Sequence, residues 1–113
     1  MGFLHHANYL TYFEIARTEM LRASGGSYRR MEEDGQFVVV VRAECRYQRP
    51  AHYDDLLTIR VTVAKVTPAK IEHHYDVFRD GQLLAVAQVI LAVVDRQGNV
   101  QRVPEWIRAK EEG

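Results

Sequence analysis

The side chains best suited to chemistry in this chain are concentrated at its start, in the stretch MGFLHHANYLTYFEIAR. A glycine, two histidines, an asparagine and a tyrosine stand directly in front of a helical pattern: Gly2, His5, His6, Asn8 and Tyr9. The first turn of a helix carries unpaired backbone N–H groups and a partial positive charge, which suit an oxyanion or an anionic ligand. We therefore expect a site where the chain enters this helix.

These residues also have structural interpretations. Asn8 either caps the helix, because its side-chain oxygen can accept from first-turn N–H groups, or contacts a ligand. The side chains of His5 and His6 diverge because they are adjacent, so the pair is a poor metal site; they either line a pocket or pack at the surface. Tyr9 and Phe13 form the apolar stripe of the helix and are expected in the core, with ring edges that a ligand could touch.

Other polar side chains along the chain favour structural roles. Asp54 and Asp55 precede a strand, where neighbours point in opposite directions, so we expect them to fix a turn. His73 and His74 point to opposite faces of a strand and cannot bind one metal together. The five histidines have no zinc spacing. We expect His73 to be a satisfied core or interface histidine and the single Cys45 to be an inert core thiol.

The elements that must position these groups follow from hydrophobic periodicity. A helical pattern runs over residues 7–23 and ends at a glycine pair, Gly25 and Gly26, with room for a short helical turn in residues 27–34. A period of two then predicts strands over residues 37–47, 56–66, 71–77 and 82–94. Asp80-Gly81 signals a two-residue hairpin. A short helix is expected over residues 104–110.

The faces of these strands predict how they are arranged. In residues 37–47 the odd-numbered positions, from Phe37 to Tyr47, are expected to form one buried face. The strand at 82–94 is apolar on both faces and should be central, with Ala85 and Ala87 leaving room for the helix. One long helix and four antiparallel strands give an α+β fold, a sheet wrapped around a helix. A single helix leaves sheet surface uncovered, which favours a homo-oligomer.

Composition limits the class of protein. The 113 residues suffice for one domain, residues 1–113, and the 47% hydrophobic and 27% charged fractions are those of a globular protein. The charges of the 15 basic and 15 acidic residues cancel. The chain also has no basic stripe, which argues against a nucleic-acid partner. The apolar runs are too short or too broken to span a membrane. A single cysteine and the lack of a signal-peptide pattern make the cytoplasm the expected location.

Two blocks of the sequence resemble a known family. MGFLHHANYLTYFEIARTEMLR is similar to the helix-entry motif of the 4-hydroxybenzoyl-CoA thioesterase family of hot-dog folds, which includes acyl-CoA thioesterases of the tol-pal cluster. YQRPAHYDDLLTI at residues 47–59 resembles that family's strand-turn-strand signature of proline, small residue, tyrosine and paired aspartates. The two blocks occur in the family's order, and the resemblance covers nearly the whole chain. It implies a hot-dog fold and hydrolysis of a small or aromatic acyl-CoA at a site formed across a dimer interface.

The resemblance also implies which residues act. His6 matches the family's oxyanion position and would act through its main-chain N–H. The family's catalytic aspartate would fall two residues before Met1, so the chain is a fragment, has a misassigned start or does without that group. Another branch of hot-dog thioesterases carries its carboxylate on this helix, which makes Glu14 the internal candidate. Glu14 otherwise forms an ion pair with Arg17 or a hydrogen bond with Thr18.

Coenzyme A would require cations for its phosphates. Lys65 and Lys70 flank the Thr67-Pro68 turn and are the expected contacts, unless they are ordinary solvated charges. The resemblance implies no metal or redox cofactor, and a homodimer or homotetramer. The alternative function is a non-catalytic hot-dog module that binds acyl-CoA or a protein partner.

Overall fold

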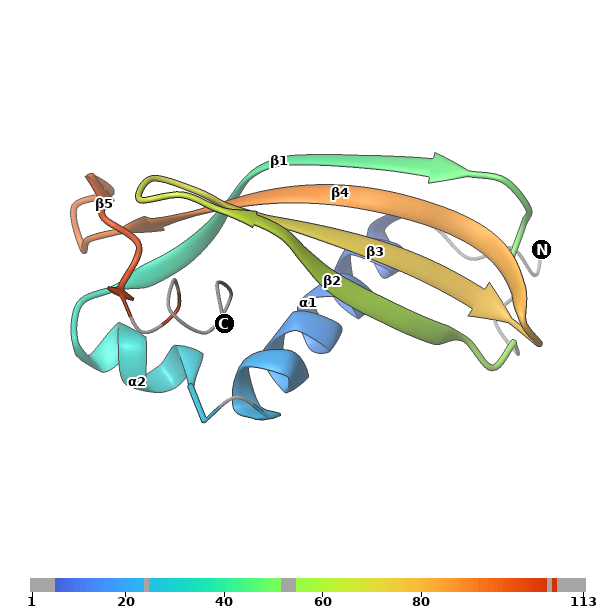
Figure 1. Ribbon diagram of the computed structural model, residues 1–113, viewed down its shortest axis with the longest axis horizontal. Helices are drawn as coiled ribbons and strands as arrows, with labels where there is room; N and C mark the ends of the chain where they lie inside the picture. The colour runs from blue at the N-terminus through green and yellow to red at the C-terminus, as the bar shows by residue number, and fades with distance from the viewer. Residues whose placement is uncertain (1–5, 24, 52–54, 106, 108–113) are drawn as a thin grey trace.

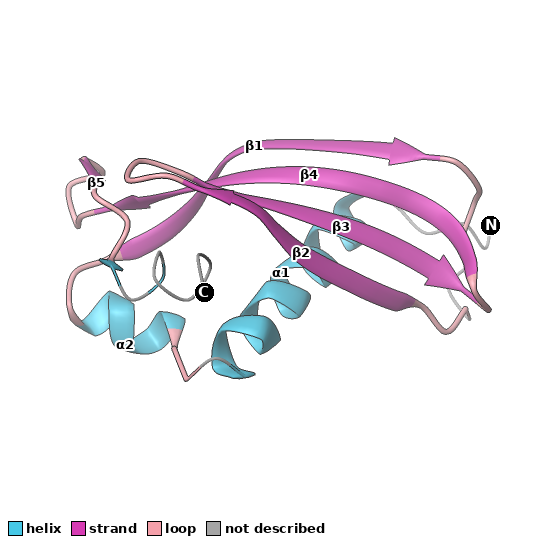
Figure 2. Cartoon of the chain, viewed as in Figure 1, coloured by secondary structure: helices cyan, strands magenta, loops and turns pink. Residues whose placement is uncertain are grey.

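The computed structural model describes residues 6–23, 25–51, 55–105 and 107, which form a sheet with helices on one side (Figure 1). Figure 2 distinguishes the helices and strands by colour. The elements in chain order are α1 (His6–Ala23), α2 (Tyr28–Glu33), β1 (Phe37–Tyr47), β2 (Thr58–Val66), β3 (Ile71–Arg79), β4 (Gln82–Val94) and β5 (Val100–Gln101).

The sheet is antiparallel and has the order β1-β4-β3-β2, with β5 paired to the end of β4. The central position predicted for residues 82–94 is confirmed, since β4 lies between β1 and β3. Cys45 of β1 pairs with Ala87 of β4, and Ala87 pairs with Tyr75 of β3. Residues paired across strands share a face of the sheet, so this row defines the face toward α1.

The core lies between α1 and the sheet. Tyr9 and Phe13 are each 1% exposed, and the Phe13 ring stacks on Tyr75 with a centroid distance of 4.5 Å. Ala85 and Ala87 of β4 are buried on the helix side, as predicted. This packing is the α+β hot-dog arrangement, in which one long helix lies against a curved antiparallel sheet.

The end of α1 has the predicted glycine termination. The N–H of Gly26 donates to the carbonyl of Leu21, and the N–H of Gly25 donates to that of Arg22. Gly25 has a φ of 87°, in the left-handed region that glycine reaches without steric cost. This pair of bonds is a Schellman motif, which fixes the direction in which the chain leaves α1.

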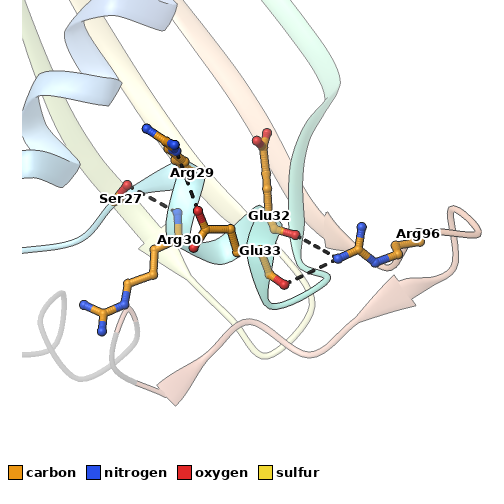
Figure 3. Close-up of polar contacts among 6 residues, drawn as sticks. All are labelled: Ser27, Arg29, Arg30, Glu32, Glu33 and Arg96. Atoms are coloured by element: carbon orange, nitrogen blue, oxygen red, sulfur yellow. Dashed lines mark hydrogen bonds and ion pairs between the residues drawn. The ribbon is translucent and has the colours of Figure 1, made fainter.

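Helix α2 confirms the short helical turn expected in residues 27–34. The Ser27 hydroxyl caps it by accepting from the backbone N–H of Arg30 at 3.3 Å. At its other end, Arg96 donates to the carbonyls of Glu32 and Glu33 at 3.3 and 3.4 Å, as Figure 3 shows. The Arg96 guanidinium also lies 5.7 Å from the Phe37 ring centroid, so one side chain ties α2 to the strand that follows it.

The buried face predicted for residues 37–47 is wrong for the N-terminal half of this strand. The register of β1 against β4 shifts between Val40 and Arg42, which is the signature of a β-bulge. Val40 pairs with Leu91 on the helix face, whereas Arg42 pairs with Ile90 on the opposite face. The odd-numbered pattern therefore holds only from Ala43 to Tyr47, and before the bulge the even-numbered residues face α1.

The turns follow the sequence signals closely. Asp80 and Gly81, with φ values of 50° and 78°, join β3 to β4 in the predicted hairpin. Thr67 N–H donates to the Lys70 carbonyl at 2.9 Å and closes the β2–β3 turn. The strand β5 was not predicted, because two residues carry no periodic signal. Residues 105 and 107 are helical where a closing helix was expected.

Among the residues with described positions, no helix is both long and apolar enough to cross a membrane. Assignment of residues 1–113 to a single domain stays a prediction.

Candidate active site

The N-terminal end of α1 lies at the end of the sheet where β1 finishes (Figure 1). The Tyr9 and Tyr47 rings meet edge to face there, with a centroid distance of 5.3 Å. His6 is the first residue of α1 that the structure describes, and the N–H groups of a helix's first turn have no intrahelical acceptor. Gly2 and His5 lie outside the described residues.

The predicted capping role of Asn8 is wrong. A residue that caps a helix precedes the first helical residue, and Asn8 is instead the third residue of α1. The helix begins earlier than the pattern from residue 7 indicated, which moves Asn8 inside the first turn. Contact between Asn8 and a ligand stays a prediction.

Tyr9 brings a polar atom into the core beside the start of the helix. Its hydroxyl is buried and has no hydrogen-bond partner among the residues that the structure describes. Burial raises the pKa of this hydroxyl, with a further increase from Cys45 and Asp55, so Tyr9 remains neutral. A buried hydroxyl without a partner is unfavourable unless a water or a ligand completes it.

Asp55 is held by an ion pair next to this region. Its carboxylate accepts from the Arg79 guanidinium at 2.8 Å, and both side chains are largely buried. Arg79 also donates to the carbonyl of Pro50 at 3.4 Å. These contacts agree with the structural role expected for Asp55, which joins the segment before β2 to the end of β3. Asp54 lies outside the described residues.

Glu14 is exposed on α1, and it does not line the described cavities. The Thr18 hydroxyl donates to the backbone carbonyl of Glu14 at 2.8 Å, so this bond does not involve the Glu14 carboxylate. The adjacent residue Phe13 is buried, as is Tyr9 one turn before Phe13, so Glu14 stands beside the core-facing stripe and not within it. A catalytic role for Glu14 stays a prediction.

The predicted phosphate contacts meet in a hollow of the sheet. Lys65 and Lys70 line a cavity of about 290 Å³ together with Arg42, which comes from β1. Glu72 lies in the same cavity and is paired with Lys65 across the strands. The cavity opens on the face of the sheet away from α1, because Arg42 and Glu72 both pair with Ile90 on that side. Only the two lysines were expected from the sequence, and Arg42 joins them through the pairing of β1 with β4.

One copy of the chain does not join the two groups of predicted residues. The start of α1 lies near Tyr47, which pairs with Ala85, whereas the Lys65–Lys70 turn lies next to Ile71, which pairs with Leu91. Six residues of extended strand separate Ala85 from Leu91, a distance of about 20 Å. The groups also lie on opposite faces of the sheet, so a shared substrate would need a second copy.

Cysteine and histidine show the inert character expected of them. Burial raises the pKa of the Cys45 thiol, which disfavours the reactive thiolate. His73 is 4% exposed and its Nδ1 lies 3.3 Å from the Tyr75 hydroxyl, as expected of a satisfied core histidine. His74, on the opposite face, pairs with Glu72 at 3.0 Å. No cluster in the described part of the chain has the ligands for a metal ion.

Comparisons with known proteins agree with this geometry. Residues 1–86 match the model of the thioesterase superfamily. The acyl-CoA thioesterase YbgC of Haemophilus influenzae is 36% identical over 95 residues, which cover 83% of this chain and 70% of the relative. The acyl-CoA thioester hydrolase YbgC of Escherichia coli O157:H7 is 30% identical over 95 residues, covering 83% of this chain and 71% of the relative.

Two solved structures extend the match to nearly the whole chain. A hypothetical protein from Aquifex aeolicus has a TM-score of 0.89 and 31% identity, covering 96% of this chain and 85% of the other. The DHNA-CoA thioesterase of Staphylococcus aureus has a TM-score of 0.91 and 25% identity, covering 99% of this chain and 79% of the other. These matches confirm the resemblance found in the helix-entry and strand-turn-strand blocks.

Proposed function

Because this chain belongs to the thioesterase superfamily, we propose that it hydrolyses a small or aromatic acyl-CoA to the free acid and the CoA thiol. The observation that carries the proposal is the start of α1 at His6, beside a buried tyrosine whose hydroxyl lacks a partner in the described structure. The aromatic option rests on the resemblance to 4-hydroxybenzoyl-CoA thioesterases.

The backbone N–H of His6 is the proposed oxyanion donor. Attack of water on a thioester carbonyl places negative charge on its oxygen, and a fixed N–H at a helix N-terminus stabilises that charge. The helix dipole adds to the effect in the first turn. The carbonyl oxygen would therefore lie against the start of α1, with the acyl group directed toward Tyr9.

Glu14 is the proposed base that activates the water. It is the candidate carboxylate on the same helix, and its exposure in one copy leaves it accessible to a substrate that binds between copies. In the reaction, Glu14 takes a proton from the attacking water, the CoA thiolate leaves as the carbonyl re-forms, and Glu14 returns the proton to that thiolate. The other described carboxylate near the helix start, Asp55, is already paired with Arg79.

The cavity of Lys65, Lys70 and Arg42 is the proposed contact for the phosphates of CoA. Three cations against the single carboxylate of Glu72 give it a net positive charge, which suits a polyanion. Its distance from α1 in one chain supports a site completed by a second copy, with these cations from one subunit and the helix start from the other. Such a site requires at least a homodimer.

The experiment is hydrolysis of a panel of acyl-CoAs by the purified chain, followed with a thiol reagent. Benzoyl-, 4-hydroxybenzoyl-, acetyl- and hexanoyl-CoA test size and aromaticity. Glu14→Gln should abolish turnover, whereas the matched control Glu19→Gln, which removes an exposed carboxylate paired with Arg22, should keep it. Full activity in Glu14→Gln would remove Glu14 from the mechanism, and no turnover of any substrate would remove the enzyme proposal.

The second candidate function is a non-catalytic module that binds acyl-CoA or a protein partner. The exposure of Glu14 favours it, because a catalytic carboxylate is usually enclosed with its substrate. This function predicts that free CoA raises the thermal stability of the chain while no acyl-CoA is consumed. Turnover that depends on Glu14 would exclude it.

A further inference from the structure

Polar side chains meet around a small cavity under the C-terminal half of α1, away from the proposed active site. The cavity has a volume of about 80 Å³. Arg17 of α1, Tyr28 of α2 and His73 of β3 line it, and the rest of its wall is apolar, with Ile71 and Leu91 on the sheet. Three separate elements therefore bring hydrogen-bonding groups to one cavity.

Arg17 interacts electrostatically with two neighbouring tyrosines. Burial raises the pKa of the Tyr28 and Tyr75 hydroxyls, and the Arg17 guanidinium partly offsets that increase. The Tyr75 hydroxyl lies 3.3 Å from His73 Nδ1.

The His73 ring is neutral in the folded chain. Burial, assisted by the positive charge of Arg17, lowers the pKa of His73 to about 4, so the imidazole is neutral near pH 7. A neutral imidazole carries one N–H donor. The lining of the cavity thus offers the N–H groups of Arg17, the O–H of Tyr28 and one N–H of His73 as hydrogen-bond donors.

The charge of Arg17 also lacks a close counterpart. No carboxylate of the described residues lies within ion-pair distance of it; Glu14 is near enough to raise the pKa of Tyr28 but forms no such pair. A partly buried cation without a counter-charge is unfavourable unless an anion completes the site.

We propose that Arg17, Tyr28 and His73 form a binding site for one small carboxylate ion of the size of formate or acetate. One guanidinium matches one negative charge, and the carboxylate oxygens can accept from Arg17, Tyr28 and His73 together. The apolar wall suits a methyl group. The cavity is about half the size of a cavity of about 150 Å³ that holds benzene, which limits the ligand to a few heavy atoms.

The site is separate from the proposed active site. Arg17 lies 11 residues beyond His6 in α1, which corresponds to about 16 Å along the helix. Phe13 and Tyr75, both buried and stacked on each other, fill the core between the two. Carboxylate binding can therefore be tested by itself and does not depend on thioester hydrolysis.

The test is a titration of the full chain with sodium acetate at pH 7, against sodium chloride at equal ionic strength. We expect acetate to raise the melting temperature saturably by a few degrees and to shift the NMR signals of the His73 imidazole with the same midpoint. Chloride should do neither. Hexanoate should also fail, because the cavity is too small for it. An equal effect of chloride or hexanoate, or no effect of acetate, would overturn the proposal.

Two variants and one control complete the experiment. Arg17→Gln should remove the acetate effect, whereas Arg29→Gln, which changes an exposed arginine on α2, should leave it unchanged. An acetate effect that survives in Arg17→Gln contradicts the proposed site. If Arg17→Gln does not fold, Tyr28→Phe removes only a hydroxyl and should raise the acetate midpoint several-fold; an unchanged midpoint would count against the site equally.

Discussion

At the scale of single residues, the proposed chemistry depends on a backbone group and not on an imidazole. The N–H of His6 is fixed by the helix that begins there, so it needs no rearrangement when charge develops on a substrate. The side chain at this position is then free to vary. Exchange of the residue can separate the backbone contribution from that of the side chain.

Replacing His6 with proline should lower kcat about 100-fold or more, because proline removes the N–H of an oxyanion donor. Proline is well accepted at the first position of a helix, so the fold should survive. His6→Ala keeps the N–H and is the control, with activity close to that of the native chain. Steady-state kinetics and circular dichroism measure both effects. Equal losses in the two variants would assign the role to the imidazole instead.

His73 should make stability depend on pH. Its pKa is about 4 in the folded chain and about 6.5 when unfolded, so below pH 6.5 the unfolded state binds a proton that the folded state does not. The stabilisation is present above pH 6.5 and is lost as the pH falls toward 4. Between pH 7 and 5 the loss should be about 2 kcal/mol.

Urea unfolding of the native chain and of His73→Gln at pH 7 and pH 5 measures this difference. The variant should lose clearly less stability over this range. His74→Gln is the matched control, since His74 is exposed on the other face of β3 and pairs with Glu72. The same pH dependence in all three chains would show that His73 is not the titrating group.

At the scale of elements, α2 illustrates how a short helix is held in place. Six residues are too few for a stable isolated helix, so α2 depends on the Ser27 cap and on Arg96 at its other end (Figure 3). Arg96 reaches it from the turn after β4, far away in the sequence. The position of Tyr28 in the proposed carboxylate site therefore depends on a contact with a distant turn.

Arg96→Ala should destabilise the chain by about 1 kcal/mol, because it removes a cation from the C-terminal carbonyls of α2 and from the Phe37 ring. Arg102→Ala removes an exposed arginine and should change stability much less. Thermal and urea unfolding measure both. A loss in Arg96→Ala no larger than that in the control would mean that the contact does not stabilise α2.

Periodicity and turn chemistry predicted most of these elements. The strands at 37–47 and 82–94 and the Asp80-Gly81 hairpin were predicted because local sequence dictates them. The bulge at Val41 was missed, since Val38 to Val41 are all valine and either face fits an apolar pattern. The Arg96 contact was missed because it joins segments whose proximity only the fold creates.

The same distinction applies to the sites. The helix-entry residues form one continuous stretch, so their proximity could be predicted from the sequence. Arg42 joins Lys65 and Lys70 only through the pairing of β1 with β4, and Arg17 meets His73 only where α1 crosses β3. Neither of these contacts can be predicted from the spacing of the residues along the chain.

At the scale of the whole molecule, β1 leaves one edge of the sheet unpaired in the described structure. Large apolar side chains are exposed along it: Val40 at 48%, Val41 at 53% and Tyr47 at 47%. An unpaired apolar edge is unusual in a monomer and favours pairing with another strand. The proposed active site, which needs cations from a second subunit, is consistent with such pairing.

Val40→Lys should therefore weaken self-association at least about tenfold, since roughly 1.4 kcal/mol is enough for that change, and should reduce hydrolysis in parallel. Val100→Lys changes an equally large apolar residue of β5, 65% exposed, and should affect neither. Light scattering after gel filtration, over a range of concentrations, measures the association. If the native chain is monomeric and active, the shared site is wrong.

The order of the strands also has a consequence for how the chain reaches its native state. The strands β2, β3 and β4 form a meander of neighbours, whereas β1 must wait for β4, which follows it after a long intervening segment. Contacts between distant segments form late because closing a long loop is entropically costly. Hydrogen exchange during refolding should thus show protection of β3 amides before those of β1. Until β1 pairs, one edge of β4, the most apolar strand of the protein, stays open to pairing with other nascent chains and so to aggregation.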